Sequence, residues 1–260
     1  MTDTYSLQDL ELRSPWVNAA GFLGFAPPAR KGEGEAATLD EARQDEFPLG
    51  AFITNPVSAG RRTPAEGRVF LPFEGGFLLH TGLPNPGLSH VLTAHAQRWK
   101  RSPVPIWVHL IGDVPQDIDR MVRKLEAREY ISTIELGISP KAAPELALDL
   151  VIAAVGELPV VVSIPLERIN EAWLEKLPAL GVRAVSLSAP YGTLPGREAR
   201  LVNGRIYGPA IFPLALNALR SLKRLGLPVI AGGGVFRKKD GEAMLAAGAL
   251  AVQLDAVLWQ

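Results

Sequence analysis

The sequence predicts an α/β protein, specifically a (β/α)8 or TIM barrel, formed by a single domain over residues 1–260. Three observations predict this fold. Short apolar runs alternate with segments of helical periodicity along nearly the whole chain, which is typical of a parallel sheet covered by helices. Eight such runs can be counted, and 260 residues is a usual length for eight βα units. No linker rich in proline, glycine and serine divides the chain.

The elements follow one another as strand and helix. The predicted strands are Trp16–Ala20, Gly50–Thr54, Ile106–Leu110, Thr133–Ile138, Pro159–Ile164, Ala184–Ser188, Pro228–Ala231 and Ala251–Leu254. The predicted helices are Leu39–Glu46, Ser89–Lys100, Pro115–Glu129, Pro144–Val155, Asn170–Leu180, Ala210–Leu225 and Lys239–Ala247. Gly181, Gly226 and Gly248 stand just past three of these helices, where a left-handed residue commonly ends a helix.

Two long excursions, Phe22–Thr38 and Pro56–Leu88, follow the first two strands, so we place the functional site at the strands' carboxyl ends. The eighth helix is missing, since none is predicted after the last strand. A partner subunit, a second copy in a homo-oligomer, the segment Tyr5–Leu12 or residues beyond a truncated end would then cover strands eight and one. Each alternative predicts an exposed apolar flank on this chain alone.

The composition narrows the class of partner. Basic and acidic residues both number 27, which argues against a face for nucleic acid or an anionic membrane and leaves small molecules as the expected ligands. The absence of cysteine excludes disulfides and thiolate chemistry. His90 and His95 are five residues apart, which does not fit a metal pair, and we predict no metal site. With no signal-peptide core at the N-terminus, a cytoplasmic location is expected.

Gly232, Gly233 and Gly234 follow the seventh strand and precede a helix. Uncovered amides at such a corner predict a phosphate site, and a tight turn is the alternative. Glu135 lies inside the apolar fourth strand, either as a buried carboxylate with a satisfied partner or as a site residue. Tyr191 and Tyr207 could flank a flat ring or pack within loops.

Seven short motifs occur in order along the chain. They are NAAGFLG (18–24), GAFITNPVS (50–58), HTGLPNPG (80–87), IELGIS (134–139), PVVVSIP (159–165), NGRIYGPAIFP (203–213) and AGGGVF (231–236). In this order and at these strand ends, the motifs resemble the dihydroorotate dehydrogenase family of FMN-dependent barrels over most of the chain. The resemblance implies an oxidoreductase with FMN across the barrel mouth.

The resemblance also implies site residues. The positions that match flavin contacts are Ala19, Ala20, Gly21, Asn55, Ser163, Gly208, Gly232, Gly233 and Gly234, and those for substrate are Asn85 and Ser188. Ser139 lies beside the position of the family's catalytic base. His80 is the second acid–base candidate, because an imidazole exchanges protons near neutral pH.

This chain departs from the family pattern at five polar contacts. Asn55 and Ser163 stand where the family has lysines that contact the flavin, and Leu79, Gly137 and Ser188 replace substrate asparagines. The family's V-Q-x-G-T run, which gives amides to the phosphate, here contains Asp255, and a carboxylate repels a phosphate dianion. Arg237, Lys238 and Lys239 could compensate, or could form a solvated start to a helix.

Two functions are therefore expected from the sequence. The first is an FMN oxidoreductase whose substrate has changed and which oxidises dihydroorotate weakly or not at all. The alternative is a flavin-free pseudoenzyme, either a binding or scaffolding subunit or a barrel that binds another phosphorylated ligand.

Overall fold

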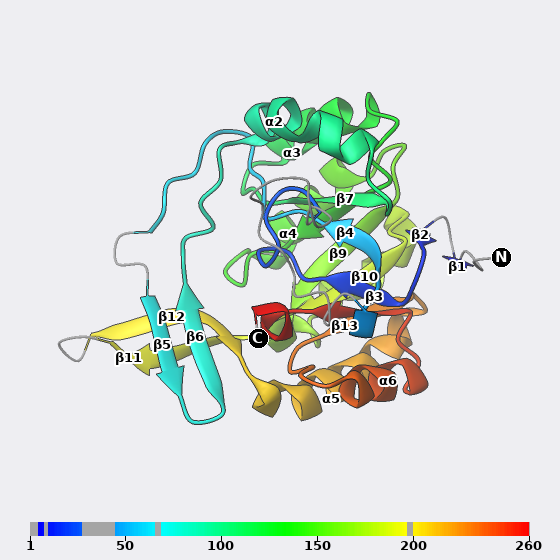
Figure 1. Ribbon diagram of the computed structural model, residues 1–260. Coiled ribbons are helices and arrows are strands. Elements are labelled where there is room, and N and C mark those ends of the chain that lie inside the picture. Colours follow the sequence, from blue (N-terminus) through cyan, green and yellow to red (C-terminus); the bar gives the residue numbers. More distant parts are fainter. Residues whose placement is uncertain (1–4, 8–9, 28–44, 66–68, 197–199, 260) are drawn as a thin grey trace.

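The computed structural model describes residues 5–7, 10–27, 45–65, 69–196 and 200–259 (Figure 1). Eight parallel strands close into a barrel in which β14 lies beside β3. The barrel strands are β3 (Trp16–Asn18), β4 (Leu49–Ile53), β7 (Ile106–Leu110), β8 (Thr133–Gly137), β9 (Val160–Pro165), β10 (Ala184–Ser188), β13 (Val229–Gly232) and β14 (Ala251–Leu254). The predicted barrel is confirmed, and every strand lies within about two residues of its expected bounds.

Helices pack on the outside of the barrel (Figure 1). The α-helices are α2 (Leu88–Lys100), α3 (Pro115–Glu126), α4 (Pro144–Ala154), α5 (Phe212–Leu222) and α6 (Lys238–Ala246). Short 3-10 helices are η1 (Leu166–Arg168), η2 (Ala172–Lys176), η3 (Pro178–Leu180), η5 (Pro209–Ile211), η6 (Lys223–Leu225) and η7 (Ala256–Trp259). These bounds agree with five of the predicted helices, and the predicted helix Leu39–Glu46 falls almost wholly outside the described residues.

The predicted α-helix Asn170–Leu180 is wrong. This segment forms the 3-10 helices η2 and η3 instead. Pro178 has no amide hydrogen, and its ring would clash with the carbonyl four residues earlier in an α-helix. Buried Trp173 and Leu174 hold the segment against the barrel without a regular helix.

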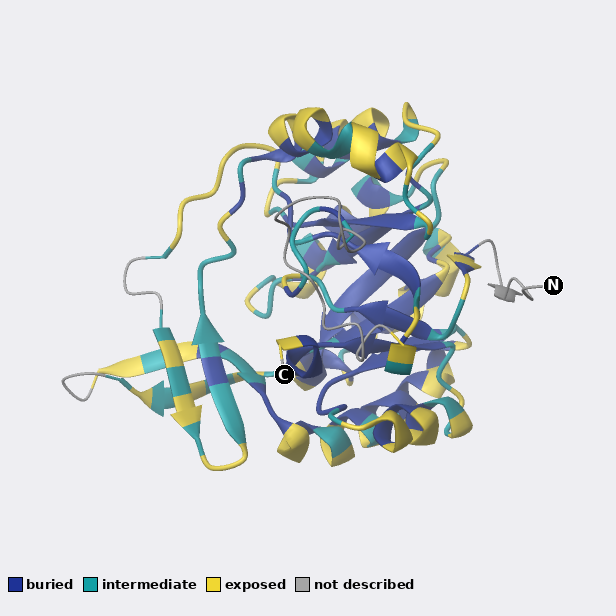
Figure 2. Cartoon of the chain, in the orientation of Figure 1, coloured by how far each residue is buried: buried dark blue, intermediate teal, exposed yellow. Residues whose placement is uncertain are grey.

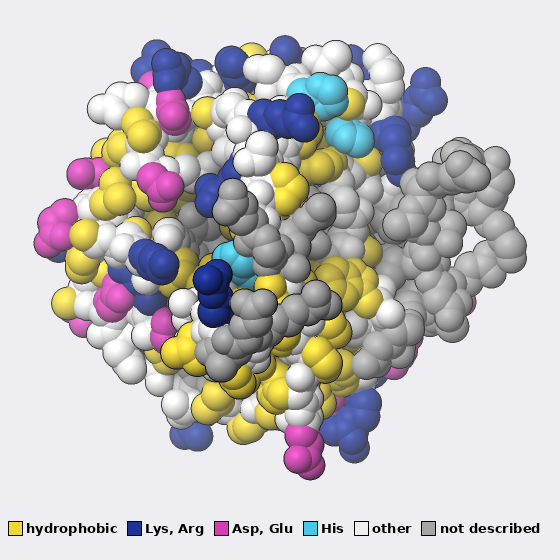
Figure 3. All heavy atoms as spheres, turned by 90° about the vertical axis from the view of Figure 1, so that its left-hand side faces the viewer, with side chains coloured by type: hydrophobic (Ala, Val, Ile, Leu, Met, Phe, Trp, Pro, Cys, Tyr) yellow, Lys and Arg dark blue, Asp and Glu magenta, His cyan; other side chains and the backbone are white. Residues whose placement is uncertain are grey.

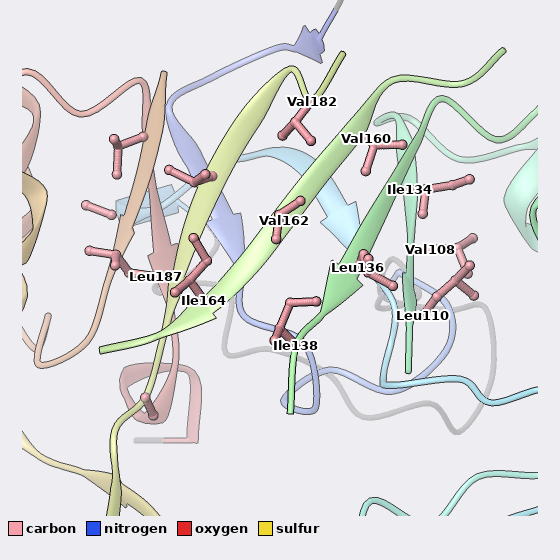
Figure 4. Close-up of a cluster of buried hydrophobic side chains, with 14 of the residues drawn as sticks. Val108, Leu110, Ile134, Leu136, Ile138, Val160, Val162, Ile164, Val182 and Leu187 are labelled. Carbon is pink, nitrogen blue, oxygen red and sulfur yellow. The ribbon is translucent and has the colours of Figure 1, made fainter. Parts of the chain in front are cut away.

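Alternation along the strands separates two apolar layers. Val160, Val162 and Ile164 of β9 point outward into the layer beneath the helices, which Figure 4 shows for neighbouring strands as well. Val161 belongs to a second cluster inside the barrel, where Trp107 is the largest side chain. Because side chains alternate along a strand, the remaining inward positions determine what faces the barrel mouth.

A second, antiparallel sheet stands beside the barrel (Figure 1). Its order is β11 (Tyr191–Pro195), β12 (Leu201–Tyr207), β6 (Gly76–His80) and β5 (Val69–Phe73). It is more exposed than the barrel strands, as Figure 2 shows. Strands β5 and β6 belong to the excursion after β4, and β11 and β12 belong to the segment after β10. This sheet was not predicted from the sequence.

The N-terminal hairpin, β1 (Tyr5–Leu7) and β2 (Leu10–Leu12), lies at the amino end of the strands. Leu10 and Leu12 are buried in the cluster inside the barrel, so this segment does not cover strands eight and one. At the expected exposed apolar flank, Trp259 of η7, just after β14, is half-exposed, whereas the residues of β3 and β14 are buried. Trp16 is buried against Phe47 and against Gly241 of α6, where any Cβ would collide with the indole ring. No described helix is long and apolar enough to cross a bilayer.

Candidate active site

A cavity of about 300 Å³ opens at the carboxyl ends of the barrel strands. The turn after β3, the loops after β7 and β8, and the antiparallel sheet all contribute to its wall. Figure 3 views the molecule from the side of the antiparallel sheet, and basic and histidine side chains lie together near the centre of that face. The cavity is therefore bordered by groups that could bind an anion.

Most of the site residues expected from the sequence meet at this cavity. Those that line it are Ala19, Ala20, Gly21, His80, Ser139, Ser163, Ser188, Gly232 and Gly233. Buried Arg168 donates to the carbonyl of Ser139 at 2.6 Å and so fixes the loop that carries this serine. The Ser139 hydroxyl accepts the amide of Lys141 at 3.3 Å, which leaves its proton available to a ligand.

Asn55, Asn85, Gly208 and Gly234 are outside the cavity lining. Asn55 Oδ1 accepts the amide of Gly24 at 3.1 Å. Asn85 is buried and accepts the amides of Ser58 and Gly87, so both carboxamides hold loops together.

Packing of the backbone explains why glycine occupies positions 208 and 234. A Cβ on Gly208 would collide with the backbone at Gly75, and one on Gly234 would collide with Phe212 at the start of α5. Both glycines permit close approaches of backbone, whatever else they do.

A hydrogen-bonded network forms the polar floor of the cavity. Glu135 of β8 is fully buried, and its Oε2 lies 2.6 Å from Nδ1 of His109 on β7. Its Oε1 accepts from Ser186 Oγ of β10 at 2.7 Å and from Gln253 Nε2 of β14 at 2.6 Å. Four strands therefore contribute to one carboxylate.

The environment of Glu135 favours its charged form. Burial opposes the charge, but the hydrogen bonds and charge of His109, with the donors Ser186 and Gln253, outweigh it, so the pKa of Glu135 lies below its ordinary value. An ionised carboxylate accepts hydrogen bonds and donates none, so Nδ1 of His109 carries a proton. That proton fixes the orientation of the imidazole.

His109 occupies space that a side chain at position 137 would need. A Cβ on Gly137 would lie 2.5 Å from Nε2 of His109. The glycine that replaces the family's substrate asparagine thus makes room for this imidazole. Sequence reasoning did not predict the network, although polar residues at alternate strand positions were a usable signal.

Two arginines that line the cavity have no acidic partner in the described part of the chain. Arg205 of β12 donates to Ser188 Oγ and to the carbonyl of Ala189, both at 3.0 Å, and lies over the ring of Tyr191. Arg62 donates from Nε to the carbonyl of Gly82. Among described residues, no carboxylate is within ion-pair distance of either guanidinium. Unneutralised guanidinium groups at a cavity favour a carboxylate or phosphate ligand.

Sequence comparison shows which known proteins this chain is similar to. No family model matches the chain. It is 29% identical to the catalytic subunit of dihydroorotate dehydrogenase B (NAD(+)) of Streptococcus pneumoniae strain R6, over 95% of this chain and 83% of that protein. The Shouchella clausii protein of the same name is 28% identical over 94% and 83%, and that of Methanosarcina acetivorans 25% over 98% and 85%.

The chain is thus similar to dihydroorotate dehydrogenases at 25–29% identity. Similarity over nearly the whole chain agrees with the closed barrel of parallel strands.

The corner after β13 is where the resemblance described above implies a phosphate site. Gly233 and Gly234 have positive φ angles of 107° and 74°. Within the described residues, their amides have no hydrogen-bond acceptor. Unpaired amides on a left-handed turn form a concavity for an anion.

A carboxylate lies in the same cavity. Asp255 is buried, lines the cavity with Gly232 and Gly233, and accepts the amide of Ala256 at 2.6 Å. Desolvation raises the pKa of Asp255 to about 7, against smaller opposing contributions from backbone amides. This corner is therefore close to neutral only when Asp255 is protonated.

The basic residues after the glycines do not offset Asp255. Arg237 makes an ion pair with Asp240, whose Oδ2 also accepts the amides of Phe236 and Arg237. Arg237, Lys238 and Lys239 do not line the cavity. They form the start of a helix, and compensation by them finds no support.

The backbone around the cavity fits the ring and the phosphate of a flavin nucleotide. The turn Ala19–Gly21 and the glycines after β13 let a flat ring and an anion approach the backbone. Tyr207 lines the cavity and also packs against Phe22 and Phe77, with ring centroids 5.2 and 5.3 Å away, so it contributes to loop packing and faces the cavity as well. The residues present thus fit FMN on the condition that Asp255 does not oppose its phosphate.

Proposed function

We propose that this chain is an FMN-dependent oxidoreductase that acts on an anionic substrate other than dihydroorotate. The observation that carries the proposal is one cavity that is lined by Gly21, Gly232 and Gly233 and by two guanidinium groups, those of Arg62 and Arg205, which have no acidic partner among the described residues. FMN, when bound, supplies a two-electron acceptor for such chemistry. The rest of the proposal concerns the residues of this chain.

Arg205 and Arg62 bind and orient the anionic group of the substrate. Arg205 is pre-organised, because Ser188 and Ala189 already hold one of its nitrogens. Guanidinium groups fixed in this way lose little side-chain entropy on binding a carboxylate. Ser139 and His80, at the same cavity, exchange a proton with the substrate.

Dihydroorotate is expected to bind poorly. In the family, as the resemblance implies, lysines and asparagines hold this substrate and the flavin. Here Leu79 offers no polar group, Gly137 has no side chain, and Asn55 holds Gly24. Each lost charge-assisted hydrogen bond costs about 1.5–3 kcal/mol of binding.

The absorbance spectrum of freshly purified protein, before and after incubation with FMN, tests the cofactor. A flavin spectrum that a reductant bleaches and oxygen restores supports the proposal. Protein that stays colourless and shows no thermal shift with FMN contradicts it. Anaerobic mixing of the flavin-loaded protein with dihydroorotate should leave the flavin oxidised, and rapid bleaching would restore dihydroorotate as the substrate.

A second candidate is a flavin-free barrel that binds another phosphorylated ligand or acts as a scaffold. The observation that favours it is Asp255, a buried carboxyl at the corner where the family phosphate binds. Saturating FMN that leaves the melting temperature unchanged, while sugar phosphates raise it, would support this alternative over the oxidoreductase.

A further inference from the structure

The contacts of Asp255 resemble those of a bound anion. Its Oδ1 accepts the amide of Ala256 at 2.6 Å, and the amide of Asp255 itself also stabilises the charged carboxyl. By the resemblance to the dihydroorotate dehydrogenases, these two residues match the part of the V-Q-x-G-T run that gives its amides to the phosphate. The side chain of Asp255 therefore engages amides that a phosphate would otherwise use.

We propose that the carboxylate of Asp255 is an internal competitor for the phosphate of FMN or a similar phosphate monoester, and that the ligand binds with uptake of a proton by Asp255. The proposal rests on the proposed function only for the identity of the ligand. Protonation removes the charge that repels the phosphate and weakens the hold of the carboxyl on Ala256. The resulting neutral carboxyl can donate a hydrogen bond to a phosphate oxygen.

The surroundings of Asp255 leave its charge uncompensated. In the described part of the chain, no lysine or arginine is within ion-pair distance of it. From the antiparallel sheet, the charged and titratable groups on this side are Tyr207, Arg205 and Tyr191. Arg205 is held at Ser188, and burial raises the pKa of Tyr207 to about 12, so that phenol stays neutral. From the start of α6, Arg237 faces Asp240.

Geometry and titration point the same way. Asp255 lines the cavity together with Gly233, whose amide has no hydrogen-bond acceptor among the residues that the structure describes. A pKa near 7 means that the proton is available at neutral pH and is lost at higher pH. A phosphate held at Gly233 would make the charged carboxyl still less favourable, so binding and proton uptake are linked.

Two probes that differ only in the phosphate isolate this effect. FMN and riboflavin share the flavin ring and the ribityl chain. Their dissociation constants should be measured at pH 6.5 and pH 8.5 for the natural protein, Asp255→Asn and Asp113→Asn. Asp113 lines the same cavity and is exposed, so Asp113→Asn removes the same charge without removing the competitor.

For the natural protein and Asp113→Asn, we expect FMN to bind about tenfold or more weakly at pH 8.5, because the protonated fraction of Asp255 falls by roughly that factor. Asp255→Asn should bind FMN tightly at both pH values, with less than about a threefold change. Riboflavin should show little pH dependence in all three proteins. Titration calorimetry at pH 8.5 in buffers of different ionisation enthalpy should detect proton uptake that Asp255→Asn abolishes.

The proposal is overturned if the pH dependence for FMN is the same with and without Asp255, or if riboflavin shows it equally. If neither flavin binds to any of the three proteins, the proposed cofactor is wrong. The same titrations with inorganic phosphate then decide the role of Asp255, because a competitor still predicts tighter phosphate binding by Asp255→Asn at pH 8.5. Equal phosphate binding by both proteins contradicts it.

Discussion

Glu135 and Asp255 are both buried carboxyl groups of one cavity, yet their pKa values shift in opposite directions. Both lose hydration to a similar degree. Hydrogen bonds from His109, Ser186 and Gln253 replace the lost water at Glu135, whereas the hydrogen bonds to Asp255 from described residues come from backbone amides. The donor set, and not the depth of burial, decides whether a buried carboxyl stays charged.

The two groups also have opposite effects on stability as pH changes. The pKa of Glu135 is lower in the folded protein, so its contribution is present above the ordinary value of 4.5 and is lost as pH falls further. The pKa of Asp255 is higher in the folded protein, about 7 against 3.8, so the folded state binds a proton that the unfolded chain releases. Stability therefore falls as pH rises from about 3.8 to 7 on account of Asp255.

The largest expected effect follows from Glu135→Gln. The substitution removes the charge and places an amide hydrogen among three donors, so we expect a loss of about 3–5 kcal/mol in the free energy of unfolding at pH 7. Urea unfolding followed by circular dichroism measures it. A loss below about 1 kcal/mol would show that the network does not hold the charge of Glu135.

Asp255→Asn should have the opposite sign. At pH 8.5 the natural protein carries a buried charge at Asp255 that the variant lacks, so we expect the free energy of unfolding of the variant to be higher by ~2–4 kcal/mol. At pH 5 the change should be much smaller, because Asp255 is already protonated in the folded natural protein. Urea unfolding at the two pH values checks this. Equal changes at both values would place the effect in packing and not in titration.

The barrel strands and the position of Asp255 could be predicted from the sequence. The predicted bounds of Ile106–Leu110 and Ala184–Ser188 match the structure, because short runs with apolar residues between helical segments leave little ambiguity. The phosphate-side position of Asp255 followed from the family motif, and Asp255 does line the cavity with Gly232 and Gly233.

The rest depended on contacts that are distant along the chain. Ser186 and Gln253 are 51 and 118 residues from Glu135, so alternation could show that they point inward but not that they meet. The antiparallel sheet was missed for a different reason. Pro72 lies within β5, and a proline ordinarily argues against a strand unless the strand is at a sheet edge, as β5 is.

Gly137→Ala tests the contact on which the orientation of His109 depends. A methyl group there would lie 2.5 Å from Nε2, so the imidazole must move away from Glu135. We expect a loss of about 1–3 kcal/mol in the free energy of unfolding. In a His109→Ala background the same change should cost much less, and a double-mutant cycle from urea unfolding measures this coupling. Additive losses would contradict the placement of the imidazole.

The smallest effect is expected outside the cavity, at Asn55. Its Oδ1 accepts the partly buried amide of Gly24, so Asn55→Ala should lower the free energy of unfolding by about 1 kcal/mol. Asn55→Lys restores the residue of the family pattern, but position 55 is not in the cavity lining. We therefore expect no gain in flavin binding or dihydroorotate oxidation from the lysine, measured by flavin fluorescence and anaerobic bleaching. A gain in either would contradict this placement, because it would show that a lysine at position 55 reaches the cavity. The loop that contains Gly24 would then have to move when its hydrogen bond to Asn55 is lost.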